Sequence, residues 1–308
     1  MMKPGIYSDM PIEEYHSDKT ILSSTGIKEA KKSSRHFAYY LSTDQERKTH
    51  FDFGNAFELA LLDDVSGTNE FASNVAVFNT EGWTKEALKE KPGLRSPKSS
   101  KHYQDRKSEF LKENQGKYLI DDVGDESMDT IFNMVLSCKA DKIISSVLGK
   151  MDYQKSFIWK DDETGVLCKT RPDLCVNKQK VIVDIKTCLD ASPRAFFRDM
   201  AKFDYPLQAT MQIEGVEQTG YVDKIDDYYW LCVEKTAPFN AQLYRFQLQD
   251  REMCHDAYRY YLTRAGKVIN DFLTKRITDF TEIPGYTEMT ADRFGIIDVE
   301  IPPYYLNN

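Results

Sequence analysis

Two strand-like runs joined by a short polar segment, within residues 166–186, constrain the fold more than any other part of the chain. The second run, Val181–Lys186, is apolar and β-branched until an acid and a base appear two residues apart, at Asp184 and Lys186. The first run carries an Arg-Pro-Asp sequence that ends at Asp173. Because side chains alternate across a strand, Asp184 and Lys186 are predicted to share one face. The polar residues between the runs predict a hairpin turn.

Pairing of the two runs would bring Asp173 beside Asp184 and Lys186. Two carboxylates and one ammonium are costly to bury together unless a metal ion compensates them. Carboxylates suit a hard cation such as Mg²⁺, which can support phosphodiester hydrolysis. The Ile185 carbonyl is a further candidate ligand, and Lys186 could orient water or stabilise phosphate charge. The alternative is a surface ion pair on an amphipathic strand, because an acid and a lysine two residues apart are common by chance.

Composition narrows the class of protein. The chain has 308 residues, 41% hydrophobic and 12% aromatic, which suits one sizeable folded core. Its net charge of −8 argues against a general nucleic-acid coat but allows a local basic groove. No cysteine pair has CxxC spacing, and no signal peptide or membrane-length apolar run is present, so we expect a cytoplasmic protein with reduced thiols and no membrane contact. The five histidines lack the spacing of a zinc hydrolase.

The periodicity of apolar residues predicts alternating helices and strands in a single domain, residues 1–308. The predicted helices cover residues 27–40, 52–62, 101–114, 125–148 with a break near 139, a short helix from 193, 206–220 and 250–273. The predicted strands cover residues 153–160, 166–176, 180–187, 228–234 and 241–248. Residues 79–108 are polar and lysine-rich, which predicts a loop or partly mobile segment, either solvated or tracking a phosphate backbone. A tail from about residue 275 is expected to pack on the surface.

Two other positions each have two interpretations. Ser23, Ser24 or Thr25 could cap the helix that follows, or their hydroxyls and the free amides of that helix could contact a phosphate. Glu58 lies within the apolar run 52–62, where an acid is either on the solvent-facing stripe or held inward by a metal or a base.

The run TRPDLCVNKQKVIVDIKT resembles the core of the PD-(D/E)xK nuclease superfamily, and more closely that of phage and prophage exonucleases of the exodeoxyribonuclease VIII type. Further segments resemble, in order, the N-terminal part, the first catalytic helix, the helices after the lysine and the closing strands of that family: GIYSDMPIEEYHSD with LSSTGIKEAKKSSRHF, FGNAFELALLDD, DASPRAFFRDMAKFDYPLQATMQIEGV and WLCVEKTAPFNAQLYRF. The resemblance covers roughly residues 4–275. It implies an α/β (α+β) restriction-endonuclease-like core, with a central mixed β-sheet flanked by helices.

The resemblance also implies an activity. Members digest one strand of linear double-stranded DNA processively from a 5′ end, with one or two Mg²⁺ ions per site and Mn²⁺ as a substitute. The remaining 3′ overhang serves a single-strand-annealing recombinase. A homo-oligomeric ring around the duplex and a place in the host cytoplasm, for a phage-encoded enzyme, are expected. The alternatives are a nuclease of the same fold that trims single strands or CRISPR-associated ends, and a catalytically silent DNA-binding protein.

Site residues follow from the resemblance position by position. Asp173 and Asp184 match the metal ligands, and Lys186 matches the catalytic lysine. Gln208 matches the glutamine of the family's Q-x-x-x-Y helix, which supports the active site. Glu58 stands where this family usually has histidine. Lambda-type exonucleases have glutamate there, which implies that Glu58 is a metal ligand.

The remaining matched positions concern DNA and one departure from the family. Arg171 and Thr187 lie beside the core motif and are candidates for phosphate contact. Ser24 and Thr25 fall where related exonucleases use hydroxyls near the 5′-phosphate. Gln212 replaces the tyrosine of the Q-x-x-x-Y helix, so that position carries no expectation.

Overall fold

A mixed five-stranded sheet, in the order β10-β9-β8-β7-β4, forms the centre of the computed structural model, which describes residues 2–43, 51–149, 152–176, 180–274, 276 and 279–283. Its strands are β4 (Asp152–Tyr153), β7 (Leu174–Val176), β8 (Val181–Cys188), β9 (Asp227–Glu234) and β10 (Ala241–Arg245). Strands β8 and β9 are parallel, and the other neighbours are antiparallel. Two smaller sheets consist of β1 (Gly5–Tyr7), β5 (Ser156–Lys160) and β6 (Leu167–Thr170), and of parallel β2 (Val75–Phe78) and β3 (Tyr118–Asp121).

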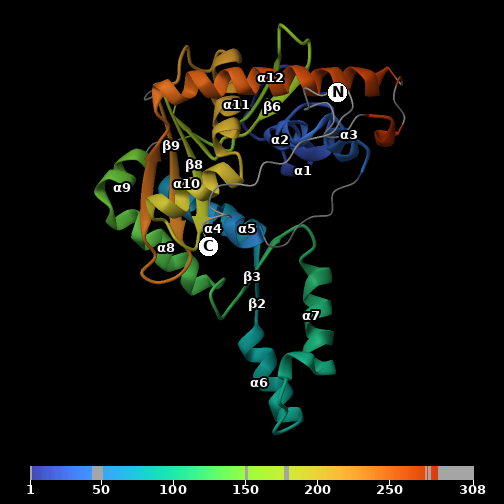
Figure 1. Ribbon diagram of the computed structural model, residues 1–308. Helices are drawn as coiled ribbons and strands as arrows, with labels where there is room; N and C mark the ends of the chain where they lie inside the picture. Colours follow the sequence, from blue (N-terminus) through green and yellow to red (C-terminus); the bar gives the residue numbers. More distant parts are fainter. Residues whose placement is uncertain are drawn as a thin grey trace, which may run out of the picture.

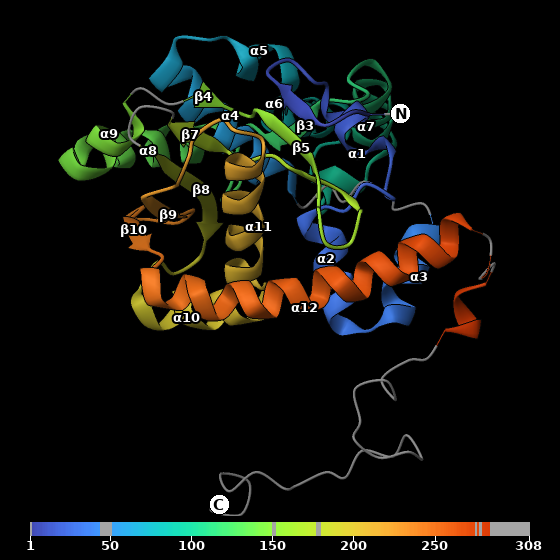
Figure 2. The same ribbon diagram turned by 90° about the horizontal axis from the view of Figure 1, so that it is seen from above.

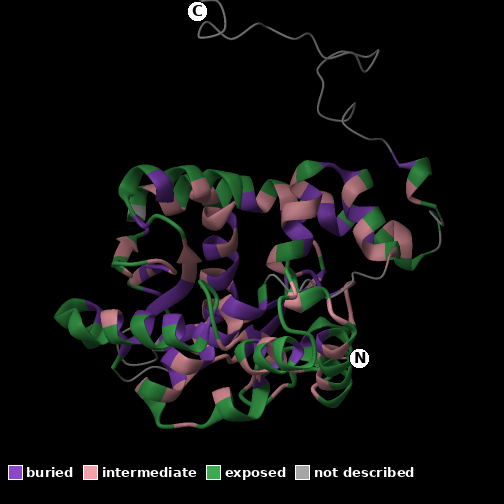
Figure 3. Cartoon of the chain, turned by 90° about the horizontal axis from the view of Figure 1, so that it is seen from below, coloured by how far each residue is buried: buried purple, intermediate pink, exposed green. Residues whose placement is uncertain are grey.

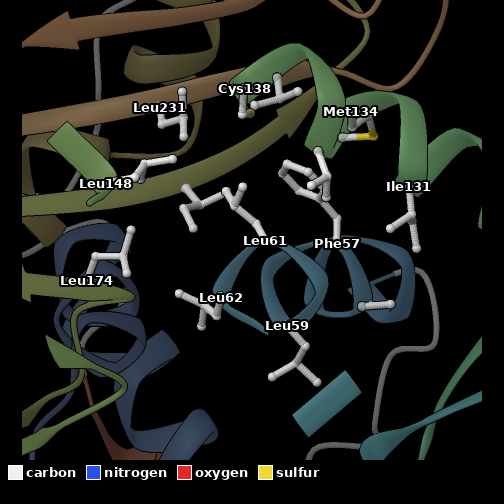
Figure 4. Packing of buried hydrophobic residues seen from close by; sticks show 14 of the residues in the cluster. Phe57, Leu59, Leu61, Leu62, Ile131, Met134, Cys138, Leu148, Leu174 and Leu231 are labelled. Atoms are coloured by element: carbon white, nitrogen blue, oxygen red, sulfur yellow. The ribbon is translucent and has the colours of Figure 1, made fainter. Parts of the chain in front are cut away.

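Helices cover both faces of the central sheet (Figure 1). On one face lie α4 (Asp52–Ser66), α8 (Met128–Ala140) and α9 (Lys142–Leu148), whose apolar side chains share a core with Val183 and Ile185 of β8. Figure 4 shows Phe57 and Leu61 of α4 in this core, together with side chains of α8. On the other face lie α10 (Pro193–Lys202) and α11 (Tyr205–Gln218), which pack on Ile182 and its neighbours. Successive side chains of β8 therefore point into two different cores, one on each face of the sheet.

A third core joins the N-terminal helices to the rest of the chain. It lies between α2 (Ser24–Lys32), α3 (Ser34–Ser42), α11 and the long helix α12 (Leu248–Leu273). Ile27, Phe37 and Tyr258 are fully buried in it. Figure 2 shows α12 crossing α11 and reaching α2 and α3. Figure 3 shows buried segments gathered at the centre and exposed ribbon on the surrounding helices.

A helical arm connects β2 to β3. It contains α6 (Thr80–Glu90), the 3₁₀ helix η2 (Pro97–Ser99) and α7 (Lys101–Glu113), and Figure 1 shows it extending away from the central sheet. The predicted helix near residues 101–114 is confirmed by α7. The loop or partly mobile segment predicted for residues 79–108 is wrong over residues 80–90, which form α6 because Trp83 and Ala87 give that polar segment a buried side.

Two other segments differ from prediction. The helix expected at residues 27–40 is interrupted at Ser33, whose backbone is extended and whose hydroxyl accepts a hydrogen bond from the His36 amide to begin α3. The strand expected at residues 166–176 is divided between β6 and β7, which belong to different sheets. Pro172 lies between these strands, and proline lacks the N–H that a continuous ladder requires.

The other long elements match their predicted positions closely. The break expected near residue 139 falls at Asp141, which caps α9. Helices α4, α10, α11 and α12 and strands β8, β9 and β10 occur where periodicity predicts them, and β7 pairs with β8 as the predicted hairpin. The hairpin-turn residues 177–179 and the tail 284–308 lie outside the described residues. Short helices α1 (Ile12–Ser17), α5 (Glu70–Asn74) and η3 (Phe280–Glu282) complete the described part, which contains no helix long and apolar enough to span a bilayer.

Candidate active site

Strand β8 directs Asp184 and Lys186 to the face that α11 covers. Val183 and Ile185 point to the α4 side, so the prediction of a shared face for Asp184 and Lys186 is confirmed. The Asp184 side chain has no exposed surface, whereas the Lys186 side chain is 19% exposed. The Lys186 ammonium pairs with Oδ2 of Asp184. An ion pair in this position combines a fully buried acid with a base that still reaches solvent.

Asp173 immediately precedes β7. Because Leu174 lies opposite Val183 in the antiparallel ladder, Asp173 arrives beside Asp184. Its Oδ2 accepts a hydrogen bond from the Ile185 amide at 2.7 Å. The start of β7 and the middle of β8 thus bring both acids of the sequence motif together, as the hairpin predicts.

Glu58 on α4 faces this group rather than the solvent stripe. It is half-buried, and its Oε1 accepts a hydrogen bond from the side-chain amide of Gln154 at 2.9 Å. Burial raises the pKa of Glu58, and the charge of Asp184 adds to the increase while the Gln154 hydrogen bond opposes it. Glu58 therefore faces inward, and its described partner is the Gln154 amide rather than a metal or a base.

The charges of the site are strongly interdependent. Burial, then repulsion from Glu58 and Asp184, raises the pKa of Asp173 well above its ordinary value. Burial alone would lower the pKa of Lys186, but attraction to Asp184 and Asp173 outweighs it and holds the pKa above its usual value. The site is thus rich in negative charge that the protein alone stabilises poorly.

Gln208, on the first turns of α11, connects the acids to the N-terminal helices. Its Nε2 donates a hydrogen bond to Oδ1 of Asp184 at 2.9 Å, and its Oε1 accepts one from Lys28 at 3.0 Å. Burial, together with the charge of Lys186, lowers the pKa of Lys28 to about 8. The sequence offered no signal for Lys28, because a lysine on a helix is ordinarily a solvated surface residue. Only the packing of α2 on α11 reveals it.

Gln212 and Tyr205 complete the α11 side. Gln212 is buried, and its Oε1 accepts a hydrogen bond from the hydroxyl of Tyr228 at 2.6 Å. The Tyr205 ring lies 5.1 Å from the Lys186 ammonium, within cation–π range. Gln212 thus braces α11 against β9, one turn beyond Gln208.

The predicted DNA-contact residues differ in their surroundings. Arg171 donates hydrogen bonds to the Ser156 hydroxyl at 2.8 Å and to the Met10 carbonyl at 2.7 Å, and burial lowers its pKa. Thr187 is half-buried where α4 approaches β8, and a Cβ added to Gly54 would lie 3.4 Å from its hydroxyl. Arg171 therefore anchors the N-terminal segment to the connection between β6 and β7.

Ser24 and Thr25 lie in the first turn of α2, and the cap is the preceding residue. The hydroxyl of Ser23 accepts a hydrogen bond from the Gly26 amide at 3.4 Å. Ser24 is half-buried and Thr25 is exposed, one turn before Lys28. The same helix that brings Lys28 to Gln208 thus carries both hydroxyls.

The donor chemistry of the site suits a divalent cation. Asp173, Asp184 and Glu58 offer hard oxygen atoms, and burial together with repulsion from the neighbouring acids raises the pKa of Asp173 and of Glu58. Within the described residues, however, no group of three or more His, Cys, Asp and Glu side chains is arranged to hold a metal ion. Gln208 and Lys186 engage the two oxygens of Asp184, and the Ile185 amide engages Asp173. The carboxylate oxygens are of the type that a hard cation binds. In this structure they accept contacts from Gln208, Lys186 and the Ile185 amide.

Comparison with known structures finds one chain of similar overall fold. The crystal structure of a protein from Eubacterium rectale, described as a candidate exonuclease, matches with a TM-score of 0.55 and 12% identity, covering 97% of each chain. The crystal structure of SSO0001 matches with a TM-score of only 0.26 and 10% identity, over 76% of this chain and 89% of that one. A search of curated proteins finds no match.

The sequence profile of one family spans most of the chain. The PDDEXK-like domain of unknown function (DUF3799) matches residues 23–271, which include every candidate residue from Ser24 to Gln208. The mixed sheet, with Asp173, Asp184 and Lys186 at the β7–β8 hairpin, agrees with the acid-acid-lysine pattern after which such domains are named. The chain therefore belongs to the DUF3799 family of PDDEXK-like domains and has the fold of the PD-(D/E)xK nucleases.

Proposed function

We propose that this protein is a Mg²⁺-dependent exodeoxyribonuclease of the exodeoxyribonuclease VIII type. It digests linear double-stranded DNA processively from 5′ ends and leaves 3′ overhangs. The observation that carries the proposal is the convergence of Asp173, Asp184 and Lys186 at the β7–β8 hairpin of a PDDEXK-like domain. Two neighbouring carboxylates, buried Asp184 and half-buried Asp173, beside a lysine suit hydrolysis of a phosphodiester, whose charge must be neutralised while water attacks.

Four groups are proposed to hold one or two Mg²⁺ ions, or Mn²⁺ as a substitute: the carboxylates of Asp173, Asp184 and Glu58 and the backbone carbonyl of Ile185. When bound, the cation supplies an activated water and neutralises phosphate charge. Lys186 donates a hydrogen bond that orients the attacking water or stabilises the charge on a phosphate oxygen. Its contact with Asp184 keeps the ammonium at that position. Gln208 orients the Asp184 carboxylate from the α11 side.

DNA is proposed to approach along α2 and the end of β8. Thr187 lies directly after the lysine, and Ser24 and Thr25 lie on the helix that carries Lys28. We assign phosphate contacts to these three hydroxyls, with those of α2 near the 5′-phosphate. The sequence also makes Arg171 a candidate for phosphate contact. We propose that it acts chiefly through its hydrogen bonds to Ser156 and Met10, which fix the connection between β6 and β7.

The biological setting belongs to the same proposal. A homo-oligomeric ring around the duplex would account for processive digestion, and a single-strand-annealing recombinase would use the 3′ overhang. The host cytoplasm is the proposed compartment for a phage-encoded enzyme of this kind. The support for these points is the sequence resemblance to exonucleases of this type.

Digestion of linear duplexes labelled at either the 5′ or the 3′ end tests the proposal. We expect early release of the 5′ label in Mg²⁺, with the complementary strand intact. Early release of the 3′ label, or preference for single strands, would instead identify an end-trimming nuclease of the same fold. Binding without hydrolysis in both Mg²⁺ and Mn²⁺ would identify a silent DNA-binding protein.

A further inference from the structure

The connection between α6 and α7 is the most basic stretch of an acidic chain. Residues 91–101, KPGLRSPKSSK, contain four basic side chains and no acidic one, whereas the whole protein has a net charge of −8. All four basic residues are exposed: Lys91, Arg95, Lys98 and Lys101. We call these four residues the basic tip. In Figure 1 the tip lies at the far end of the helical arm, away from the central sheet.

The basic tip differs from the sides of the same arm in how its charges are neutralised. Along the sides, Lys85 pairs with Glu81, and Arg106 and His102 both lie against Glu86. Among the described residues, no acidic side chain forms an ion pair with any residue of the basic tip. An ordinary solvated helical surface carries interspersed charges of both signs, as the sides of the arm do. The tip instead presents positive charge alone.

The arm has a core of its own, which holds the tip in place. Trp83 lies at the centre, with ring centroids 5.8 Å from Tyr103 and 5.6 Å from Phe110, in edge-to-face geometry. The Thr80 hydroxyl contacts the Tyr103 hydroxyl at 3.2 Å and also bonds to Asp121 of β3. Aromatic packing of this kind supports a fixed helix pair rather than an open loop. The tip is thus displayed by a folded element.

The base of the arm is attached to the helix that carries Glu58. The Leu119 amide of β3 donates a hydrogen bond to Oδ2 of Asp52, the first residue of α4, at 3.0 Å. Val75 of β2 and Ile120 of β3 are buried in the core that also contains residues of α4. The base of the arm is therefore fixed to α4. A ligand bound at the tip would be held at a fixed distance from the active site.

We propose that the basic tip binds the phosphate backbone of duplex DNA outside the active site, and this inference rests on the proposed nuclease function. The partner is a polyanion because the tip presents four exposed cations and residues 91–101 contain no acidic side chain. Contacts from lysine and arginine to phosphates position DNA without reading its sequence, and they depend steeply on salt. The tip thereby gives the enzyme a grip on duplex that its acidic body does not provide.

The test compares two variants that each lose four positive charges. The tip variant is Lys91→Gln, Arg95→Gln, Lys98→Gln and Lys101→Gln together. The control variant changes four exposed lysines elsewhere on the chain to Gln: Lys142, Lys160, Lys224 and Lys267. Binding to a duplex of several helical turns is measured in EDTA across about 50 to 200 mM salt, the range over which phosphate contacts weaken strongly. Circular dichroism and Tm confirm that each variant is folded.

We expect the tip variant to bind the long duplex at least about tenfold more weakly, with a shallower dependence of log affinity on log salt by ~0.9 for each lost contact. The control variant should bind as the wild type does. Equal affinity and equal salt dependence for the tip variant and the wild type would overturn the inference. An equal loss in both variants would also overturn it, since net charge alone would then explain binding.

The inference and the proposed function can fail separately. If wild-type protein degrades DNA while the tip variant retains full binding, only the role of the tip is wrong. If wild-type protein binds DNA through the tip and no cleavage occurs with Mg²⁺ or Mn²⁺, the tip is correct and the nuclease assignment fails. For an active enzyme, we expect the control variant to cleave duplex DNA at the wild-type rate, because its four exposed lysines lie outside both the tip and the active site.

Discussion

Gln208 donates a hydrogen bond from Nε2 to Oδ1 of Asp184 at 2.9 Å, so α11 fixes the orientation of a carboxylate that has no exposed surface. A side-chain amide can turn over, which would place an oxygen against the carboxylate. Lys28 opposes that rotation, because its ammonium requires the oxygen of Gln208 on the α2 side, at 3.0 Å. An N-terminal helix therefore helps to determine which atom faces the acid in the site.

Lys28→Met is expected to lower kcat about tenfold with little change in KM, since a hydrogen bond to a charged group contributes about 1.5 kcal/mol or more. Lys31→Met is the matched control, because Lys31 joins the same two helices by pairing with Asp204 but does not contact Gln208. It should leave kcat unchanged, and Lys28→Arg should restore part of the rate. A raised KM with unchanged kcat for Lys28→Met would show that Lys28 contacts DNA instead of positioning Gln208.

Glu58→Gln separates metal binding from folding. Burial raises the pKa of Glu58, so its ionised form weakens the fold at neutral pH, and a neutral amide of the same shape removes that cost. The hydrogen bond from Gln154 can persist. We expect Tm in EDTA to be equal or higher and cleavage in Mg²⁺ to fall by about 100-fold. Wild-type cleavage by this variant would exclude Glu58 as a metal ligand.

Gly215→Ala tests the packing of α11 on the three-stranded sheet β1-β5-β6. A Cβ there would lie 2.5 Å from the Trp159 ring and 2.6 Å from the Thr170 methyl group. Such overpacking should lower the free energy of unfolding by about 1–3 kcal/mol in urea denaturation. Gly54→Ala is the control: its Cβ would meet only Thr187, at 3.4 Å, and alanine favours a helix by about 1 kcal/mol. Equal stability of the two variants would contradict the packing described here.

Lys169 predicts a pH dependence of stability. Its ammonium is buried and donates hydrogen bonds to the carbonyls of Tyr15 and Asp18, and burial lowers its pKa to about 8. Between that value and the unfolded value near 10.5, the unfolded chain binds the extra proton, so stability should rise with pH by up to about 1.4 kcal/mol per unit. Below pH 8 both states are protonated, and this contribution is flat.

The corresponding measurement compares urea denaturation of wild type and Lys169→Met at pH 7 and at pH 9.5. The variant should be less stable at both values, because two carbonyls lose their donor. The difference between the two proteins should widen at the higher pH. A difference that narrows would mean that the pKa of Lys169 is not lowered by folding.

The sequence was informative where a local pattern determines the structure. The β-branched run before Asp184 predicted β8, and the alternation of side chains predicted that Asp184 and Lys186 share a face. Residues 166–176 were predicted as one strand because the segments on both sides of Arg171-Pro172-Asp173 have strand-like composition. The change of sheet at Pro172 depends on which partners the two halves find, β5 and β8.

Other parts of the site depend on contacts between distant segments. Whether Glu58 faces solvent or the acids could not be decided from an apolar helix alone, and the Gln154 contact decides it. Lys28 is 180 residues from Gln208 in the chain, so no local pattern announces their contact. The part of the arm before α7 was predicted to be a loop or partly mobile segment because polar residues dominate it, whereas a buried tryptophan, Trp83, packs α6 against α7.

The most direct test of the nuclease assignment is the rate of degradation of linear duplex DNA by wild-type protein and by Lys186→Ala, with Mg²⁺ and with EDTA. Lys180→Ala is the control, because Lys180 immediately precedes β8 and pairs with Asp223 at the surface. The account predicts Mg²⁺-dependent degradation by the wild type and the control, and none by Lys186→Ala, which remains folded. Undiminished degradation by Lys186→Ala would contradict the assignment.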